Sequence, residues 1–73
     1  MEHAHTLDLK VNGATETVVA HTVSQLLDFL GLESGRKGIA VAVNGAVVPR
    51  ARWPHHVLTN GDRIEIIQAR QGG

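Results

Sequence analysis

The sequence predicts an α+β fold in which one main helix packs on one face of a mixed sheet of four or five strands. Two observations predict this fold. Only residues 22–31 repeat their apolar side chains with a helical period, whereas the segments around them alternate or run apolar over strand lengths. A helix with a single apolar stripe buries that stripe against one sheet face. The 73 residues include no cysteine, so the core must rest on aliphatic burial rather than on disulfides.

A β-hairpin is predicted at the start of the chain. Residues 6–11 alternate between apolar and polar side chains, which is the period of a half-buried strand. The pair Asn12-Gly13 follows, and it suits the positive φ angles of a tight two-residue turn. Residues 16–20 are rich in β-branched side chains and are expected to form the returning strand.

The helix gives the clearest local signal. Thr22 is expected to cap the first turn, with Gln25 three residues later as a capping box requires. Gly31 stands where a left-handed residue ends a helix, and Leu32 is expected to fold back onto the last turn. The apolar stripe of the helix consists of Val23, Leu26, Leu27 and Leu30.

Two further strands are predicted after a polar loop. Residues 39–43 form a short, near-continuous apolar run, which is typical of a strand buried on both faces. The turn pair Asn44-Gly45 leads into a short strand at 47–48. Pro49 ends this strand, because proline has no N–H to donate to a ladder.

The rest of the chain completes the predicted sheet. Residues 50–59 have no clear period and are expected to form an irregular turn whose inward residues are Trp53, Val57 and Leu58. After a turn at 60–62, residues 63–69 are expected to form the last strand. A right-handed crossover through the helix leaves the first and last strands to pair in parallel at the centre. This is the β-grasp, or ubiquitin-like, arrangement.

Domain limits and surroundings follow from composition. One domain is predicted at 6–69, with a disordered N-terminus at 1–5 and a flexible Gly-Gly tail at 70–73. The formal net charge of zero, without a long basic run, argues against a nucleic-acid partner. No apolar stretch reaches the roughly 18 residues of a membrane span, and the N-terminus lacks the features of a secretory signal. We therefore expect a cytoplasmic protein.

No set of residues predicts independent catalysis. The two serines have no recognisable His–Asp partners, and the histidines form no H-E-x-x-H pattern. His3, third from the amino terminus, has the position of a Cu(II) ligand, but a polar terminus without metal is the favoured interpretation. We therefore expect neither an enzyme nor a metal site.

The second half of the sequence carries a more specific pattern. Its members are Val43-Asn44-Gly45, Val48-Pro49-Arg50, Trp53, Leu58, Gly61-Asp62-Arg63-Ile64-Glu65-Ile66 and the terminal Gly72-Gly73. With this pattern the chain resembles the ThiS family of sulfur carriers, which serve thiazole formation in thiamin biosynthesis. The resemblance extends from Leu7 over nearly the whole chain, and it implies a β-grasp carrier.

The resemblance also implies a chemistry. In this family an ATP-dependent enzyme of the ubiquitin-activating type adenylates the terminal glycine. A persulfide then converts the acyl-adenylate into a thiocarboxylate, which donates sulfur to thiazole synthase. By position, Gly73 would bear the adenylate and then the sulfur, and Gly72 and Gln71 would form the tail in the partner's channel. No cofactor is expected on the chain itself, because the partner uses the ATP.

The residue types at these positions suit the implied roles. Glycine has no Cβ, so two terminal glycines can thread a narrow channel. Tryptophan and arginine are enriched at interface hot spots, so candidate partner contacts are Arg50, Trp53 and Arg70. Trp53 has a second interpretation, favoured here, which is packing in a core that contains few other aromatic rings.

Alternative functions stay open. Arg70-Gln71 precede the glycines, where tails of the ThiS family usually have small or apolar residues. This polar pair resembles the conjugation tail of a ubiquitin-like protein modifier, in which Gly73 would form an isopeptide bond. A sulfur carrier for another pathway, such as molybdopterin formation or tRNA thiolation, is a further alternative.

Overall fold

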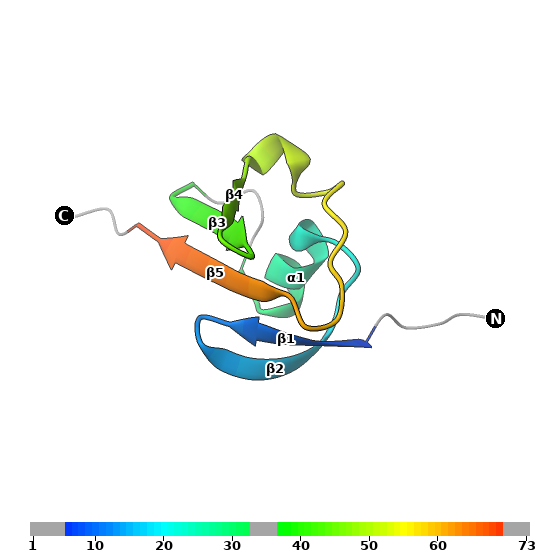
Figure 1. The fold of residues 1–73 in the computed structure, drawn as a ribbon. Coiled ribbons are helices and arrows are strands. Elements are labelled where there is room, and N and C mark those ends of the chain that lie inside the picture. Colours follow the sequence, from blue (N-terminus) through cyan, green and yellow to red (C-terminus); the bar gives the residue numbers. More distant parts are fainter. Residues whose placement is uncertain (1–5, 33–36, 70–73) are drawn as a thin grey trace.

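The computed structural model describes residues 6–32 and 37–69. The predicted N-terminus at 1–5 and tail at 70–73 lie outside the described residues. The elements in chain order are β1 (Thr6–Val11), β2 (Ala14–Val19), α1 (Val23–Phe29), β3 (Ile39–Val43), β4 (Ala46–Val48), the 3-10 turn η1 (Arg50–Arg52) and β5 (Arg63–Gln68). Figure 1 shows α1 against one face of the sheet. None of the described helices is long and apolar enough to cross a membrane.

The sheet confirms the predicted topology. Its five strands have the order β2-β1-β5-β3-β4, with β1 and β5 parallel and the other neighbours antiparallel. The central parallel pair places the first and last strands side by side, with Val11 opposite Ile64 (Figure 1). This is the mixed five-stranded β-grasp sheet expected from one helical crossover.

The first hairpin is tighter than predicted. Asn12 and Gly13 have φ angles of 49° and 85°, the positive values that a two-residue type I′ turn requires at both positions. Such a turn pairs the residues on either side of it directly, here Val11 with Ala14. Strand β2 therefore begins at Ala14 and not at Glu16, and it ends at Val19.

The start of α1 is capped as predicted, with one difference. The Thr22 hydroxyl accepts a hydrogen bond from the Gln25 N–H at 3.3 Å. In the usual capping box the Gln25 side chain would bond the N–H of the cap residue itself. Here its Oε1 accepts from the N–H of His21, one residue earlier, at 2.7 Å. The Gln25 side chain therefore fixes the chain before the helix, and the Thr22 hydroxyl caps the first turn.

The end of α1 forms the predicted left-handed cap. Gly31 has a φ of 82°, and its N–H donates to the Asp28 carbonyl at 3.1 Å. The Leu32 N–H donates to the Leu27 carbonyl at 2.8 Å. These two bonds together make a Schellman motif, and Leu32 packs against the core as expected.

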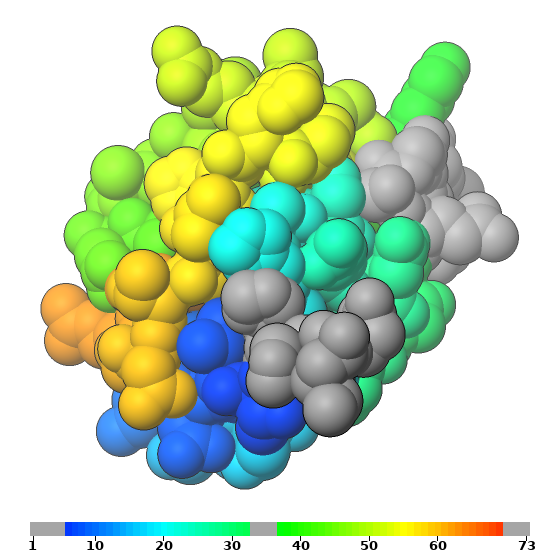
Figure 2. All heavy atoms as spheres, turned by 90° about the vertical axis from the view of Figure 1, so that its right-hand side faces the viewer, coloured from blue at the N-terminus to red at the C-terminus, as the bar shows by residue number. Residues whose placement is uncertain are grey.

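The core lies between α1 and one face of the sheet. The buried apolar side chains are Leu9, Val11, Val18, Ala20, Val23, Leu26, Leu27, Ile39, Val41, Val43, Val48, Trp53, Leu58, Ile64 and Ile66. In Figure 2 the yellow segment after η1 packs against the cyan start of α1. The N–H of Ser24 donates to the Trp53 carbonyl at 3.1 Å, which joins these two segments.

Two expectations about burial were wrong. Strand β3 is buried on one face only, since Ala40 is exposed and Ala42 is intermediate; the helix covers one face of the sheet, and the described residues leave these two alanines uncovered. Val57 does not point inward, because its side chain is 51% exposed. It pairs with Thr22 in an isolated bridge, and in extended chain adjacent side chains face opposite ways. Leu58 takes the inward place.

Candidate functional site

The predicted reaction site lies just beyond the described chain. Gly73, the channel residues Gly72 and Gln71, and the predicted partner contact Arg70 lie outside the described residues. What the structure describes is the base from which they continue, namely β5 and Ala69.

On one side, β5 is held by β3 up to its last residue. Their antiparallel register runs from Val43↔Ile64 to Ile39↔Gln68. One bond continues beyond the strands, because the Ala69 N–H donates to the Gly38 carbonyl at 2.7 Å. The backbone is thus fixed on this side to within four residues of the terminal carboxylate of Gly73.

On the other side, β5 is held by a side chain. The ladder between β1 and β5 ends at Val11↔Ile64. Beyond it the Asn12 side chain bonds both backbone groups of Ile66: Oδ1 accepts from its N–H at 2.8 Å, and Nδ2 donates to its carbonyl at 3.1 Å. The Asn12 side chain therefore makes the two hydrogen bonds to β5 that the backbone of one more strand residue would make. The sequence indicated only its role in the turn.

The face of the sheet opposite the helix is the open face, and part of it is apolar. We call the residues of this part, Ala40, Ala42, Val47 and Ile67, the open-face patch. Ile67 is 64% exposed and Val47 is 74% exposed. The registers Ala40↔Ile67 and Ala42↔Val47 place them on neighbouring strands of one face. The patch therefore lies beside the end of β5.

The sequence analysis did not identify the residues of this patch, although a signal for them exists. Ile66-Ile67 and Val47-Val48 are adjacent apolar pairs inside strands. Since successive strand residues face opposite sides, each pair must place one apolar side chain on each face. Ile66 and Val48 are buried, and their neighbours are exposed.

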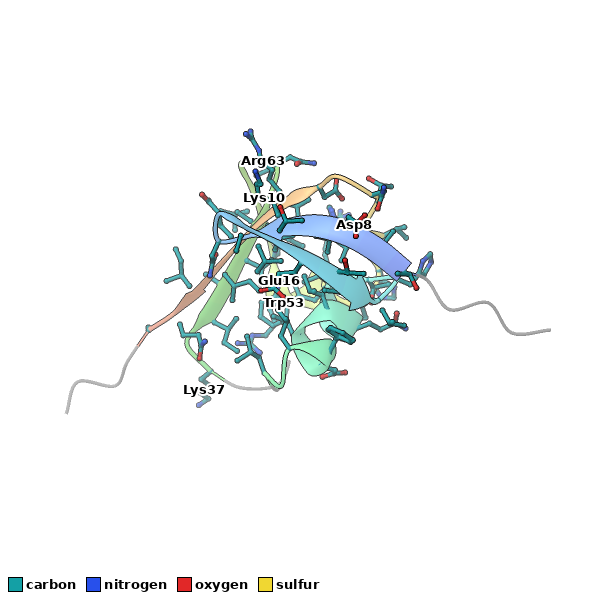
Figure 3. All side chains as sticks on the ribbon, turned by 90° about the horizontal axis from the view of Figure 1, so that it is seen from below. Asp8, Lys10, Glu16, Lys37, Trp53 and Arg63 are labelled. Atoms are coloured by element: carbon teal, nitrogen blue, oxygen red, sulfur yellow. The ribbon has the colours of Figure 1, made fainter. Side chains whose placement is uncertain are left out.

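Charged residues occupy the adjoining part of the open face. Lys10 and Arg63 are register partners on the parallel strands β1 and β5, and Figure 3 shows them close together on the side away from α1. They line a hollow together with Gly13, Gly45, Ile64 and Glu65. Asp8 lies two residues from Lys10, and Glu65 two residues from Arg63, so both signs of charge are present.

Trp53 belongs to the core. Its ring is 2% exposed, and its Nε1–H donates to the Val48 carbonyl at 2.9 Å. The interpretation of Trp53 as a core residue is therefore confirmed, and the enclosed ring has almost no surface to offer a partner. The Arg50 guanidinium lies over it, 4.6 Å from the ring centroid, which is within the range of a cation–π contact. Arg50 itself is exposed.

Asp62 is a structural residue of a turn, as predicted. Its carboxylate accepts hydrogen bonds from the N–H and hydroxyl of Thr59 and from the Asn44 amide, at 2.9 to 3.0 Å. Burial raises the pKa of Asp62, but these hydrogen bonds and the charge of His56 outweigh burial and hold the pKa below its ordinary value. A carboxylate held ionised in this way closes the turn before β5.

The described chain, residues 6–32 and 37–69, brings together no group of three His, Cys, Asp or Glu side chains that would hold a metal ion. His3 lies outside this part.

The comparisons with known proteins agree on one family. The ThiS family matches residues 9–73. The sulfur carrier protein ThiS of Escherichia coli K12 is 35% identical over 60 residues, which cover 82% of this chain and 88% of that protein. The crystal structure of the thiamine biosynthesis protein ThiS from Geobacter metallireducens superposes with a TM-score of 0.75 at 28% identity. The superposition covers 92% of this chain and 100% of the Geobacter chain.

Proposed function

The chain belongs to the ThiS family, and we propose that it is a sulfur carrier protein of thiamin biosynthesis that works through the carboxylate of Gly73. The observation that carries the proposal is the extent of the family match, which reaches the last residue and so includes the Gly-Gly terminus. The β-grasp sheet supports it, since β5 leads directly into that terminus. The chain is a protein cosubstrate and not an enzyme.

The chemistry assigned to Gly73 begins with activation, because a free carboxylate is a poor acyl donor. A carboxylate oxygen attacks the α-phosphorus of ATP, which expels pyrophosphate and leaves an acyl-adenylate. The terminal sulfur of a persulfide then attacks the acyl carbon and expels AMP. The acyl group now carries a disulfide, and a second thiol attacks its outer sulfur. This attack reduces the disulfide and releases the thiocarboxylate.

The chain supplies only the acyl group to this sequence. It contains no cysteine, so both the persulfide and the reducing thiol must come from other molecules. The ATP and its metal belong to an activating enzyme of the ubiquitin-activating type. ThiS carriers work with such an enzyme and with thiazole synthase in general, and we propose both as the partners of this chain. Since activation consumes ATP, the proposed location is the cytoplasm.

The open-face patch is the surface that we assign to the activating enzyme. Ile67 lies on the strand that leads to Gly73, two residues before Ala69, so a protein seated on the patch is placed beside the tail. Exposed apolar side chains gathered on one face are typical of interaction sites. Arg50 follows β4, the edge strand that also carries Val47, and is a candidate for a charged contact at the rim.

An accurate intact mass tests the proposal. The protein is incubated with an activating enzyme, ATP and a sulfur donor, and then digested to locate the change. We expect a mass gain equal to the replacement of one oxygen by sulfur, localised to Gly73. An unmodified terminus, under conditions that load the Escherichia coli carrier, would refute the proposal.

Arg70-Gln71 favours a second candidate, a ubiquitin-like protein modifier. That function predicts covalent adducts in which Gly73 is joined to lysine side chains of other proteins, and mass spectrometry of cell extracts would detect the branched peptides. A carrier for molybdopterin formation or tRNA thiolation would also gain the thiocarboxylate. Transfer of its sulfur by purified thiazole synthase would separate the thiamin pathway from these two.

A further inference from the structure

Gly38 touches the last described residue of the domain. Its carbonyl accepts the N–H of Ala69 at 2.7 Å. A Cβ at position 38 would lie 3.1 Å from the Ala69 carbonyl oxygen and 3.7 Å from its Cβ. The φ of Gly38 is 84°, in the left-handed region that L side chains rarely adopt. Glycine is therefore suited to this position by its backbone conformation and by the close approach of Ala69.

The close approach of Ala69 is particular to Gly38. Gly31 has almost the same φ, 82°, yet a Cβ there would meet nothing within 4 Å. The other described glycines, Gly13, Gly45 and Gly61, also have open space at this position. Glycine is thus favoured at position 38 by the close contact with the end of β5 as well as by the backbone conformation of the turn.

The direction of the chain at Ala69 matters because the remaining tail is short. Four residues follow Ala69, so the terminus lies at most about 14 Å away along an extended chain. A Cβ at position 38 would require Ala69 to give by a few tenths of an ångström, and a tilt of about 10° at Ala69 would move the end of such a tail by roughly 2 Å. Misplacement of a reacting group by about 1 Å can cost a hundredfold in rate.

From this geometry we infer that Gly38 is a positioning residue for the activation of Gly73. It holds Ala69 so that the tail leaves β5 in the direction that the activating enzyme accepts while the enzyme is seated on the open-face patch. The inference rests on the proposed function. Asn12 fixes β5 from the other side at Ile66, which leaves Gly38 as the last described support before the tail.

The test compares Gly38→Asn with Gly31→Asn. Asparagine tolerates positive φ, as Asn12 and Asn44 do here at 49° and 53°, so the two variants carry similar backbone strain. Only the variant at position 38 places a Cβ against Ala69. Ala69→Gly is a second variant. It loosens the same joint without touching the core, and we expect a smaller effect in the same direction.

Two readouts are needed. The first is the NMR signal and hydrogen exchange of the Ala69 amide, which also shows that each variant is folded. The second is pyrophosphate release by the activating enzyme, measured against carrier concentration. For Gly38→Asn we expect faster exchange at Ala69 and a kcat at least roughly tenfold lower, with KM changed less than about threefold because the docking surface is intact. Gly31→Asn should match the wild type in both.

Three results would contradict the inference. A wild-type kcat for Gly38→Asn, whether or not the Ala69 amide is disturbed, would overturn the inference alone. Equal losses of kcat in Gly38→Asn and Gly31→Asn would also overturn it, since they would reflect general destabilisation. If the wild-type chain is itself not adenylated, the proposed function fails and the inference fails with it.

Discussion

The two faces of the sheet are built from the same five strands, yet they differ in what their apolar residues contact. On the covered face, side chains such as Ile66 and Val48 belong to one buried core together with Trp53 and the buried residues of α1. On the open face, their chain neighbours Ile67 and Val47 are largely exposed. The covered face accounts for the stability of the domain. The open face carries exposed apolar residues that are not part of the core that stabilises the domain.

This difference shows how a small domain without a catalytic cleft is equipped for transfer chemistry. A chain of 73 residues has one core, and that core uses one side of the sheet. The other side of the sheet remains available to partners. The role of a residue then depends on which face of the sheet it occupies and on how far along the chain it lies from Gly73.

The largest expected effect separates the two faces within β5. Ile66→Ala removes side-chain volume from the core and should lower the free energy of unfolding by about 2–5 kcal/mol. Ile67→Ala, one residue later, removes the same atoms from the exposed face and should change it by no more than about 0.5 kcal/mol. Urea denaturation measures both. Similar losses in the two variants would contradict the division between the faces.

The open-face patch can be tested through the activating enzyme. Ile67→Asp places a charge in the proposed interface and should raise KM for the carrier at least roughly tenfold, or about 1.4 kcal/mol. Val19→Asp is the control, because Val19 is also exposed and apolar but lies on β2, the edge strand on the far side of the sheet from β3 and β4. Equal effects at both positions would show that the patch has no special role.

The smallest expected effect concerns the turn before β5 and acid stability. The pKa of Asp62 is below its ordinary value of 3.8 in the folded chain. Its contribution to stability is therefore present above the unfolded pKa, and it is lost as the pH falls through the lower folded pKa. Asp62→Asn should remove this part of the acid dependence, whereas Asp28→Asn, a substitution on α1 outside this turn, leaves the hydrogen bonds of Asp62 in place. Unfolding free energies measured against pH would show no difference between the two if the account is wrong.

Local pattern predicted most of the fold. The order of elements, the three Asn-Gly turns and the helix limits follow from periodicity, capping residues and turn chemistry, which act over a few neighbours. The contacts that hold the base of the tail do not. Asn12 and Ile66 are 54 residues apart, and nothing near Gly38 in the sequence indicates that Ala69 will approach it. Such contacts depend on how the finished sheet brings distant strands together.

Burial was harder to predict where apolar residues are consecutive. Residues 39–43 contain five apolar side chains in a row, so the pattern could not show that only one face of β3 is covered. Val57 and Leu58 posed the same question, and the bridge Thr22↔Val57 decided which of them turned inward. The candidate site at Gly73 came from the resemblance and the terminal glycines rather than from any periodicity.

The most direct test of the account is the activation of the chain with its terminus moved by one residue. Pyrophosphate release by the activating enzyme is measured for the wild-type chain and for a chain with one alanine added after Gly73. The extension should abolish activation while the urea denaturation curve stays unchanged, because it lies outside the core. Activation of the extended chain at the wild-type rate would contradict the claim that Gly73 is the working group.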